Sequence, residues 1–493
     1  MTTSPALTLA RADGSVATRS QRDCLDRAGR LAAALHQEGL VAVGDNVGIL
    51  SRNSIEFVEA SIAVASAGGR PVPVNWHWTA TEIGYVLSDA DIAVVFTGPE
   101  FVQVAQEAAA LVGRPVTVVP LALTPGRVDV EDLISGHHST LEHVDGALAA
   151  SLGLIYTSGT TGSPKGIVRE PMTAMQILSV AGSTANRMGL RDGGTALVPG
   201  PLYHTSPNAI ATLALRMGSN VVLMEKFDAE QMLSLIDRFA VEHVKVVPTM
   251  LSRLLSLPEA VRRSYDTSSL THVVHSAAPC PPEIKRQTIA WLGDAVTEFY
   301  GCSEGGTITW ISASEWSARP GSVGRPADGA GVMIVDDGGA PVPAGVDGHV
   351  TVRGADYWPR FRYLHHADAA PAFIDVGDIG HVDDDGYLYL TGRSAEIVNI
   401  GGTNVYPAEI ESVALGHPSV EDAAAVGQPV ADSDLGEQIV LYVVARPGGE
   451  LDSDDLNAWL HDRLATVKLP SQIIVRAQLP RDDNGKLYRR ALS

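Results

Sequence analysis

Strand-like and helix-like segments alternate through the first half of the chain. Apolar residues recur at helical spacing over residues 23–40, and a short apolar run follows at Asn46–Leu50. The alternation continues with helical patterns over 54–67 and from Ala80, and with strand patterns over 70–74 and 92–96. Strands separated by amphipathic helices are typical of βαβ units, in which helices cover a largely parallel sheet. The first half therefore predicts an α/β fold.

The predicted secondary-structure pattern changes twice in the second half of the chain. Strand and helix patterns persist over 195–198, 220–223, 229–239 and 244–247, but residues 324–392 carry short β-rich runs broken by Gly, Pro and Asp. The mixed pattern after Gly392 is long enough for a domain of its own. We expect a large N-terminal domain over residues 1–392, with parallel α/β sheets and a β-rich subdomain. A small, mobile α+β C-terminal domain over residues 393–493 would follow.

The charge balance narrows the class of partner. The chain has 36 basic and 57 acidic residues, which gives a net charge of -21. Such an acidic surface repels nucleic acid and anionic lipid headgroups, so we expect no nucleic-acid partner. The charge otherwise favours solubility and does not specify a substrate.

Cysteine usage and hydropathy bear on location. Cys24, Cys280 and Cys302 are the three cysteines, and their spacing fits neither a zinc site nor a redox dithiol. The first residues have no basic segment followed by an apolar core, and no apolar run is long enough to span a membrane. We expect a cytoplasmic protein with reduced thiols and no membrane span.

A loop rich in glycine and hydroxyl groups follows an apolar strand near Leu154. Hydroxyls come from Thr157, Ser158, Thr160 and Thr161, small residues are Gly159, Gly162 and Gly166, and Lys165 adds a positive charge. Backbone amides exposed by glycine, together with hydroxyls and an ammonium group, suit a phosphate. We therefore expect this loop to bind phosphate groups.

Two common nucleotide-binding motifs do not fit the chain. The P-loop needs Lys followed by Ser or Thr, and Gly166 follows Lys165. The nearest dinucleotide-type run, at 329–331, lacks a third glycine and opens no convincing helix. A P-loop nucleotidase and a Rossmann dehydrogenase are both disfavoured.

The segment 156–166 resembles the signature loop of the adenylate-forming superfamily, which includes acyl-CoA synthetases, adenylation domains of peptide synthetases and beetle luciferases. Further motifs follow in the family's order, at 201–205, 300–304, Asp378, Gly392-Arg393, 401–411 and 484–486. The resemblance covers nearly the whole chain and is closest to fatty-acid and bile-acid CoA ligases. It implies activation of a carboxylic acid as its acyl-AMP with release of pyrophosphate, followed by transfer to coenzyme A.

The resemblance also implies which residues act. The catalytic residues would be Lys486, Glu304, His204, Thr157 and Lys165. Glu304 would hold Mg²⁺, because carboxylates suit that hard cation. ATP would be held by Thr157, Ser158, Gly159, Thr160, Thr161, Lys165, Ser276, Ala277, Ala278, Tyr300, Gly301, Ser303, Asp378, Arg393 and Lys486.

Individual roles follow the family pattern. Tyr300 would pack on the adenine, Asp378 would accept hydrogen bonds from the ribose hydroxyls, and Arg393 would contact ribose or phosphate. Lys486 would neutralise charge at the α-phosphate during adenylation. His204 would gate or pack between the acyl and AMP sites. A rotation of the C-terminal domain about Ala395 would exchange Lys486 for the 401–402 loop, and Lys468 is a candidate for a coenzyme A phosphate.

Several alternatives remain open. The acceptor of the acyl group is coenzyme A in the first reading. The alternative acceptor is a carrier protein acting in trans or another nucleophile of a biosynthetic pathway. A bulky aliphatic or alicyclic acid is the first choice, and an aryl or cinnamate-like acid is second. An amino acid is disfavoured because no aspartate stands soon after His204. Assembly as a homodimer is left open by the sequence.

Overall fold

The computed structural model describes residues 5–139, 153–157, 165–366, 368–400, 403–430, 437–446, 451–482 and 485–492. The chain divides into two compact units. The first contains residues 1–245, 266–272 and 357–370, and the second contains residues 246–265, 273–356 and 371–493. The chain thus enters each unit more than once, and the boundary predicted after Gly392 stays a prediction.

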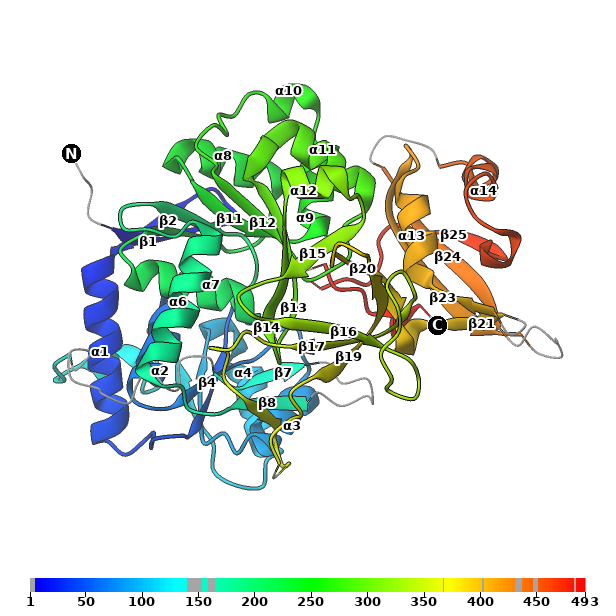
Figure 1. Ribbon diagram of the computed structural model, residues 1–493. Coiled ribbons are helices and arrows are strands. Elements are labelled where there is room, and N and C mark those ends of the chain that lie inside the picture. Colours follow the sequence, from blue (N-terminus) through cyan, green and yellow to red (C-terminus); the bar gives the residue numbers. More distant parts are fainter. Residues whose placement is uncertain are drawn as a thin grey trace. The chain divides into compact units, whose positions relative to one another are not determined.

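The first unit begins with the alternating pattern that the sequence predicts (Figure 1). Its four-stranded parallel sheet has the order β4-β3-β5-β6. The strands are β3 (Asn46–Leu50), β4 (Arg70–Pro73), β5 (Val94–Thr97) and β6 (Thr117–Pro120). The helices are α1 (Gln21–Gln37), α2 (Ile55–Ser66), α3 (Ala80–Asp89), α4 (Val102–Ala110) and α5 (Val130–Ile134).

Polar caps set where these helices begin. The Ser20 side chain accepts a hydrogen bond from the Asp23 amide at the start of α1, and Ser54 does the same for Phe57 in α2. Thr79 and Glu82 form a reciprocal capping box at the start of α3. Each cap satisfies amides that the first helical turn leaves without partners, so the strand-to-helix turns are well defined.

A second group of strands in the first unit is parallel except at its edge. Strands β11, β9, β10 and β1 are neighbours in that order, and β2 closes the edge antiparallel to β1. Their bounds are β1 (Ala6–Ala10), β2 (Val16–Ser20), β9 (Thr195–Val198), β10 (Asn220–Met224) and β11 (His243–Val246). Helices α6 (Ala174–Met188), α7 (Thr205–Arg216) and α8 (Ala229–Phe239) connect this part of the chain.

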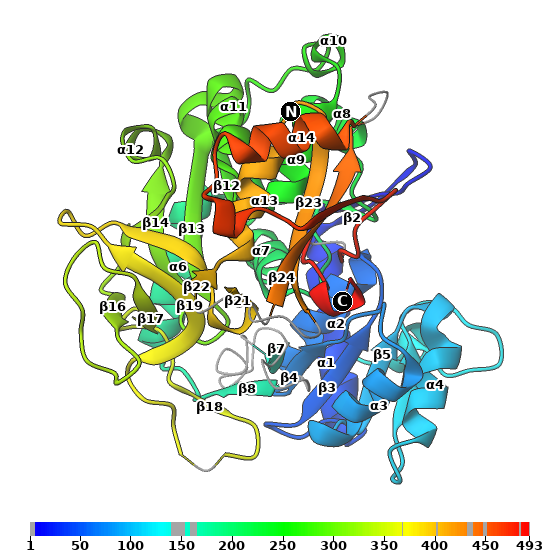
Figure 2. The same cartoon turned by 90° about the vertical axis from the view of Figure 1, so that its right-hand side faces the viewer.

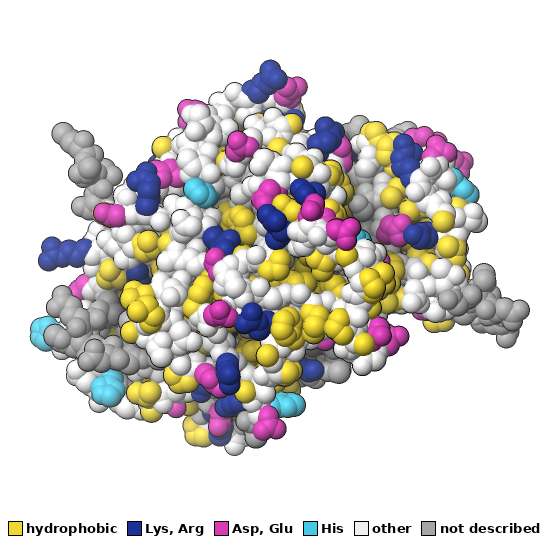
Figure 3. Space-filling model, viewed as in Figure 1, with side chains coloured by type: hydrophobic (Ala, Val, Ile, Leu, Met, Phe, Trp, Pro, Cys, Tyr) yellow, Lys and Arg dark blue, Asp and Glu magenta, His cyan; other side chains and the backbone are white. Residues whose placement is uncertain are grey.

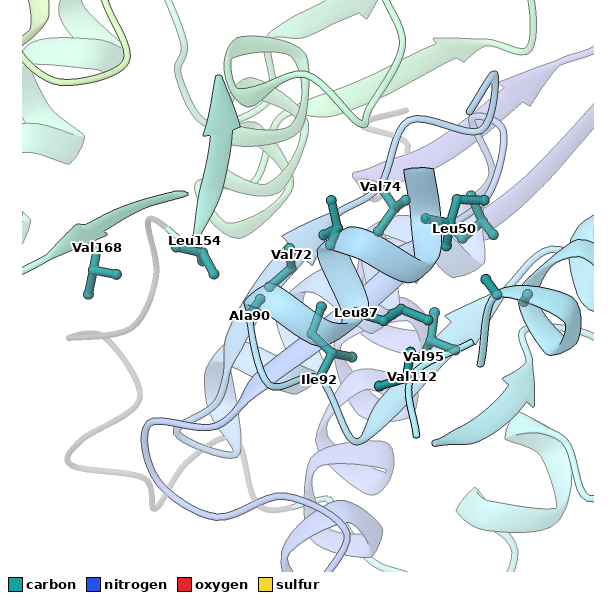
Figure 4. Close-up of a cluster of buried hydrophobic side chains, with 14 residues drawn as sticks. Leu50, Val72, Val74, Leu87, Ala90, Ile92, Val95, Val112, Leu154 and Val168 are labelled. Carbon is teal, nitrogen blue, oxygen red and sulfur yellow. The ribbon is translucent and has the colours of Figure 1, made fainter. Parts of the chain in front are cut away.

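A small three-stranded sheet packs on the four-stranded sheet. It contains β7 (Ile155–Thr157), β8 (Lys165–Arg169) and β18 (Phe361–Tyr363), all antiparallel. Leu154, just before β7, and Val168, in β8, join the buried cluster formed by β3, β4, α3 and their neighbours (Figure 4). This apolar contact fixes both ends of the predicted phosphate loop to the sheet.

The second unit changes from parallel to antiparallel pairing at one strand. Strand β13 (Val296–Cys302) is parallel to β12 (His272–His275) through the connecting helix α11 (Pro282–Leu292), and antiparallel to β14 (Gly306–Ser312). Beyond β14 the order is β15 (Ser322–Pro326), β20 (Leu388–Arg393), β19 (Ile374–Val382), β17 (Gly348–Arg353) and β16 (Gly331–Val335). These strands are the β-rich region predicted between 324 and 392. Helices α9 (Pro248–Ser256), α10 (Glu259–Arg262) and α12 (Ala313–Ala318) complete this region.

The last part of the second unit, drawn in orange to red in Figure 2, has a hydrophobic core of its own. Strand β24 (Glu437–Ala445) pairs antiparallel with β23 (Val420–Pro429) and parallel with β25 (Gln472–Val475). Helices α13 (Pro407–Leu415) and α14 (Ser453–His461) and the hairpin of β21 (Val398–Ile400) and β22 (Thr403–Val405) complete it. This α+β composition is the one the sequence predicts.

Two surface properties bear on the expectations from composition, namely the distribution of charged side chains and the hydropathy of the helices. Basic side chains are interspersed with acidic ones on the face drawn in Figure 3. Among the described residues, no helix is long and apolar enough to cross a membrane.

Candidate active site

The predicted phosphate loop lies between two paired strands of the first unit, β7 and β8. Thr157 ends β7 and pairs with Lys165 at the start of β8. The Lys165 side chain is exposed, and its Nζ lies 5.7 Å from the centre of the Tyr363 ring. Ser158, Gly159, Thr160 and Thr161 lie outside the described residues, and Thr157 is described by its backbone alone.

The base of this hairpin is held by polar contacts as well as by the apolar cluster. The Tyr156 hydroxyl donates a 2.6 Å hydrogen bond to Asp89 Oδ2, and the Leu154 amide donates to the Pro71 carbonyl. Burial, with the neighbouring Asp89 carboxylate, raises the pKa of Tyr156, so this phenol stays a donor. These contacts hold the β7 side of the hairpin against the four-stranded sheet.

His204 stands at the start of α7 in the same unit. It precedes the helix with extended backbone, and its ring lies 4.4 Å from that of Tyr203. The short segment before it is anchored by Asn53, which is only 6% exposed. The Asn53 amide donates to the carbonyls of Gly200 and Met224 at 2.9 and 2.8 Å, and its oxygen accepts from the Leu202 amide at 2.7 Å.

Sequence reasoning missed Asn53. The available signal was a polar residue three positions after the end of the buried strand β3 and just before the Ser54 helix cap. A buried amide must find partners for its donors and acceptor, so an asparagine at a strand end often orders a neighbouring backbone. Here it fixes the approach to His204.

The adenine-loop candidates follow β12 in the second unit. Ser276 is buried, Ala277 is exposed, and Ala278 is half-buried. Ala277 has φ of 80°, a left-handed conformation that alanine rarely adopts. Such a backbone persists only when its surroundings hold it, which is common at ligand sites.

Tyr300 of β13, Asp378 of β19 and Arg393 of β20 contact one another in the second unit. The Tyr300 hydroxyl donates a 2.6 Å hydrogen bond to Asp378 Oδ2, and Arg393 Nε lies 3.0 Å from Asp378 Oδ1. Asp378 in β19 is directly opposite Arg393 in β20, so strand register creates this pair. The Asp378 residue is 7% exposed. Burial, then the charge of Asp378, raises the pKa of Tyr300.

The turn after β13 carries the predicted metal ligand. The pairing of β13 with β14 has a bulge after Tyr300, and a Cβ on Gly301 would lie 2.1 Å from the Gly306 carbonyl oxygen. Only glycine allows this close approach, so Gly301 permits the turn. Ser303 and Glu304 are half-buried within it. Their hydroxyl and carboxylate oxygens are the hard donors that Mg²⁺ prefers, so the residues fit that ion.

Lys486 lies in a short turn near the end of the second unit. Its amide donates to Asp482 Oδ1 at 2.8 Å, and the Gly485 amide donates to the Asp482 carbonyl at 2.8 Å. Gly485 has φ of 79°, which the turn requires. Desolvation by surrounding protein, and then the Arg393 charge, lower the pKa of Lys486, while Asp482 and Glu396 act in the opposite direction. Lys486 is an exposed residue, but the positive charge of Arg393 still lowers the pKa of its amine.

Lys468 forms an ion pair in the second unit. Its Nζ lies 2.6 and 2.7 Å from the two carboxylate oxygens of Glu409. This ion pair joins the turn before β25 to the first turn of α13. That Lys468 also reaches a coenzyme A phosphate stays a prediction.

The fold and these motif residues are those of an adenylate-forming enzyme. A sequence model described as AMP-binding enzyme matches residues 4–358, and one described as AMP-binding enzyme C-terminal domain matches residues 409–486. The chain belongs to the AMP-binding enzyme family.

Individual relatives agree with this assignment. A fatty acid–[acyl-carrier-protein] ligase of Streptomyces coeruleorubidus is 32% identical over 94% of this chain and 89% of its own length. An indoleacetate–CoA ligase of Aromatoleum aromaticum is 32% identical over 93% of this chain and 90% of its own. The solved structure of the anthranilate CoA ligase AuaEII with anthranoyl-AMP matches this chain with a TM-score of 0.85. It is 26% identical and covers 98% of this chain and 93% of its own.

These similarities confirm the superfamily, the mixed α/β fold with a small C-terminal α+β part, and the class of AMP-forming acid–thiol ligase. They do not assign roles to single residues. The roles of Tyr300, Asp378, Arg393 and Lys486 therefore stay predictions.

Proposed function

We propose that this ligase uses ATP and Mg²⁺ to convert a carboxylic acid to its acyl-AMP, and then transfers the acyl group to coenzyme A. The observation that carries the proposal is the contact of Tyr300 and Arg393 with Asp378. Each Asp378 oxygen accepts one bond and keeps a further lone pair, so the carboxylate can accept the two ribose hydroxyls. The Tyr300 ring is then held in place to pack on the adenine.

The adenylation step needs charge neutralisation more than acid–base chemistry. The substrate carboxylate oxygen forms a bond to the α-phosphorus, and the bond from that phosphorus to the pyrophosphate oxygen breaks. The family resemblance implies that Lys165 and Lys486 would bind the phosphate oxygens, with the hydroxyls of Thr157, Ser158, Thr160 and Thr161 and the backbone of Gly159. When held by Glu304, Mg²⁺ supplies further neutralisation of phosphate charge.

The adenine and acid ends would be organised by backbone more than by charge. Ser276, Ala277 and Ala278 would lie under the adenine, while Gly301 and Ser303 would shape the turn beside the phosphates. His204, held by the Asn53 contacts, would separate the acid from the AMP. Lys486 would leave after the first step, through rotation of a C-terminal domain of residues 393–493 about Ala395. In the second step the thiol sulfur bonds to the acyl carbon, AMP departs, and the thiol proton goes to solvent.

The acceptor and the acid follow from the chemistry that relatives share. A coenzyme A thiol and a carrier-protein phosphopantetheine thiol react identically, so a carrier protein in trans is the second candidate acceptor. We propose a bulky aliphatic or alicyclic acid first and an aryl acid second. The relatives' names include a fatty acid, indoleacetate and anthranilate, which supports both classes. Helix α7 after His204 has no aspartate to pair with an α-amino group, which disfavours amino acids.

The test is pyrophosphate release with ATP and Mg²⁺ across fatty, alicyclic, aryl and amino acids, each with and without coenzyme A. We expect one acid class to release pyrophosphate, and AMP and a thioester to appear when coenzyme A is added. A response to amino acids alone would overturn the acid assignment. Persistent acyl-adenylate in the presence of coenzyme A, cleared by a carrier protein, would favour the second acceptor.

A further inference from the structure

A buried ion pair lies beside the adenine loop in the second unit. Lys285 of α11 and Glu298 of β13 are 1% and 5% exposed, and Lys285 Nζ donates a hydrogen bond to Glu298 Oε2. His275 Nε2 lies 3.8 Å from the same oxygen, and Lys285 Nζ lies 5.0 Å from the centre of the Trp316 ring. We name these four residues the Lys285 cluster.

The cost of burying these charges makes a purely stabilising role a poor explanation. Removing two ions from water consumes most of their attraction, and apolar replacements of a buried pair are often equally stable. Where such a pair is present, it can instead specify one arrangement of the surrounding backbone. The position of the cluster shows which backbone that is.

The cluster joins both ends of one loop to one strand. His275 is the last residue of β12, and Lys285 lies in the first part of α11, so residues 276–281 between them form the adenine loop. Glu298 is the register partner of His275 in the parallel pairing of β12 with β13. It also stands two residues before Tyr300, so the two share a face of β13.

The loop itself needs such support. Ala277 is exposed and has a left-handed backbone conformation. Its methyl group can form no hydrogen bond that would hold this conformation. Conformations disfavoured for alanine persist where the flanking elements determine the path of the chain. The fixed separation of the β12 end and the α11 start supplies that constraint.

We propose that Lys285 and Glu298 are positioning residues that hold the adenine loop and the Tyr300 strand in one geometry for ATP. This inference rests on the proposed function, since it assumes that the loop and Tyr300 receive the adenine. It assigns no contact with substrate to either side chain. The pair acts on the nucleotide through the backbone of residues 276–281 and through β13.

Three variants test the proposal in the full chain: Lys285→Met, Glu298→Gln and the double apolar variant Lys285→Met/Glu298→Leu. We measure the thermal midpoint, direct binding of ATP, and the KM for ATP and for the acid. The single variants should raise the Kd and KM for ATP about tenfold, because a lost partner leaves a buried charge or polar group that displaces the backbone. The KM for the acid should change by less than about twofold, well below the tenfold step of 1.4 kcal/mol.

The double variant separates positioning from stability. It should recover the thermal midpoint of the wild type, because both charges are gone, but it should keep the weakened ATP binding and a reduced preference for ATP over GTP. Recovery of ATP binding together with the thermal midpoint would overturn the proposal, as would equal increases in both KM values. If single variants do not fold, the double variant still gives this answer.

The control is Arg286→Ala, the neighbouring exposed residue of α11, whose partner Glu283 is also on the surface. It should leave the ATP constants unchanged. Measurements on the wild-type protein separate the proposed ligase function from the proposed positioning role. ATP binding without turnover of any acid would contradict the ligase function, whereas the effect of the variants on ATP binding could still be measured.

Discussion

Two groups of predicted nucleotide ligands in the second unit are built in different ways. Asp378 lies in β19, and its two oxygens are bonded by Arg393 of the neighbouring strand β20 and by Tyr300 of β13. Lys486 is carried by a turn that is closed mainly by its own Asp482, and its side chain is exposed. A group fixed by strand register is suited to both half-reactions. A group on a separate turn is suited to only one, since it can leave without disturbing the sheet.

The largest expected effect divides the two half-reactions at Lys486. Lys486→Ala should slow acyl-adenylate formation by about a hundredfold to a thousandfold, because a cation next to developing phosphate charge is lost. Thioester formation from supplied acyl-adenylate should stay within about threefold of the wild type. Rapid-quench assays of each step measure this. Lys226→Ala, an exposed lysine of the first unit, is the control. Equal decreases in the rates of acyl-adenylate and thioester formation would contradict the idea that Lys486, on its turn, serves only the first half-reaction.

The next effect concerns the strand group. Asp378→Ala should weaken ATP and acyl-adenylate binding by about thirtyfold, because charge-assisted bonds to ribose are lost and Arg393 loses its partner. Unlike Lys486→Ala, it should affect both half-reactions. Calorimetric titration with ATP and with a non-hydrolysable acyl-adenylate analogue measures the two affinities. Asp356→Ala, an exposed carboxylate paired with Arg353, should change neither.

A smaller effect is expected from Tyr300→Phe, which keeps the ring and removes the bond to Asp378. The lost bond positions Asp378 and does not touch the nucleotide, so we expect only part of its strength in ATP affinity, about fivefold or about 1 kcal/mol. The same titration measures it, and the double variant with Asp378→Ala should show no further loss. A loss larger than that of Asp378→Ala would mean that the hydroxyl contacts the nucleotide directly.

The smallest effect is in the pH dependence of adenylation. Because the pKa of Lys486 is lowered from its ordinary 10.5, the amine loses its proton at a lower pH than a free lysine. The protonated form is the active one, so acyl-adenylate formation should fall as pH rises through the lowered pKa. Lys486→Arg should lose this alkaline decline, since guanidinium stays charged. The thioester step should show no such decline, and its appearance there would contradict the comparison.

The sequence predicted the elements better than the contacts between them. Alternating apolar periodicity is local, and it located the strands and helices of the first unit to within a few residues. The pairing of Asp378 with Arg393 depends on the register of β19 and β20, which no local pattern contains. Family order brought both residues to attention, although it did not show that they bind each other.

The contacts that sequence reasoning missed involve distant partners. Lys285 resembles an ordinary charged position on an amphipathic helix, and only packing against β13 shows that it is buried. The amine of Lys468 binds Glu409, which lies 59 residues earlier in the chain. Hydrogen bonds from Asn53 likewise reach backbone more than 140 residues away, so no window of sequence could show them.

The three cysteines have a consequence for the fate of the activated acid. Burial raises the pKa of the Cys24 and Cys280 thiols and raises the pKa of Cys302 to about 12. Thiolate, rather than thiol, is the nucleophile, so near neutral pH none of the three competes for an acyl-adenylate. Cys302 stands between Gly301 and Ser303, where a reactive sulfur would invite self-acylation. If the proposed site holds the acyl-adenylate beside Gly301 and Ser303, the protonated Cys302 thiol would not become its acceptor.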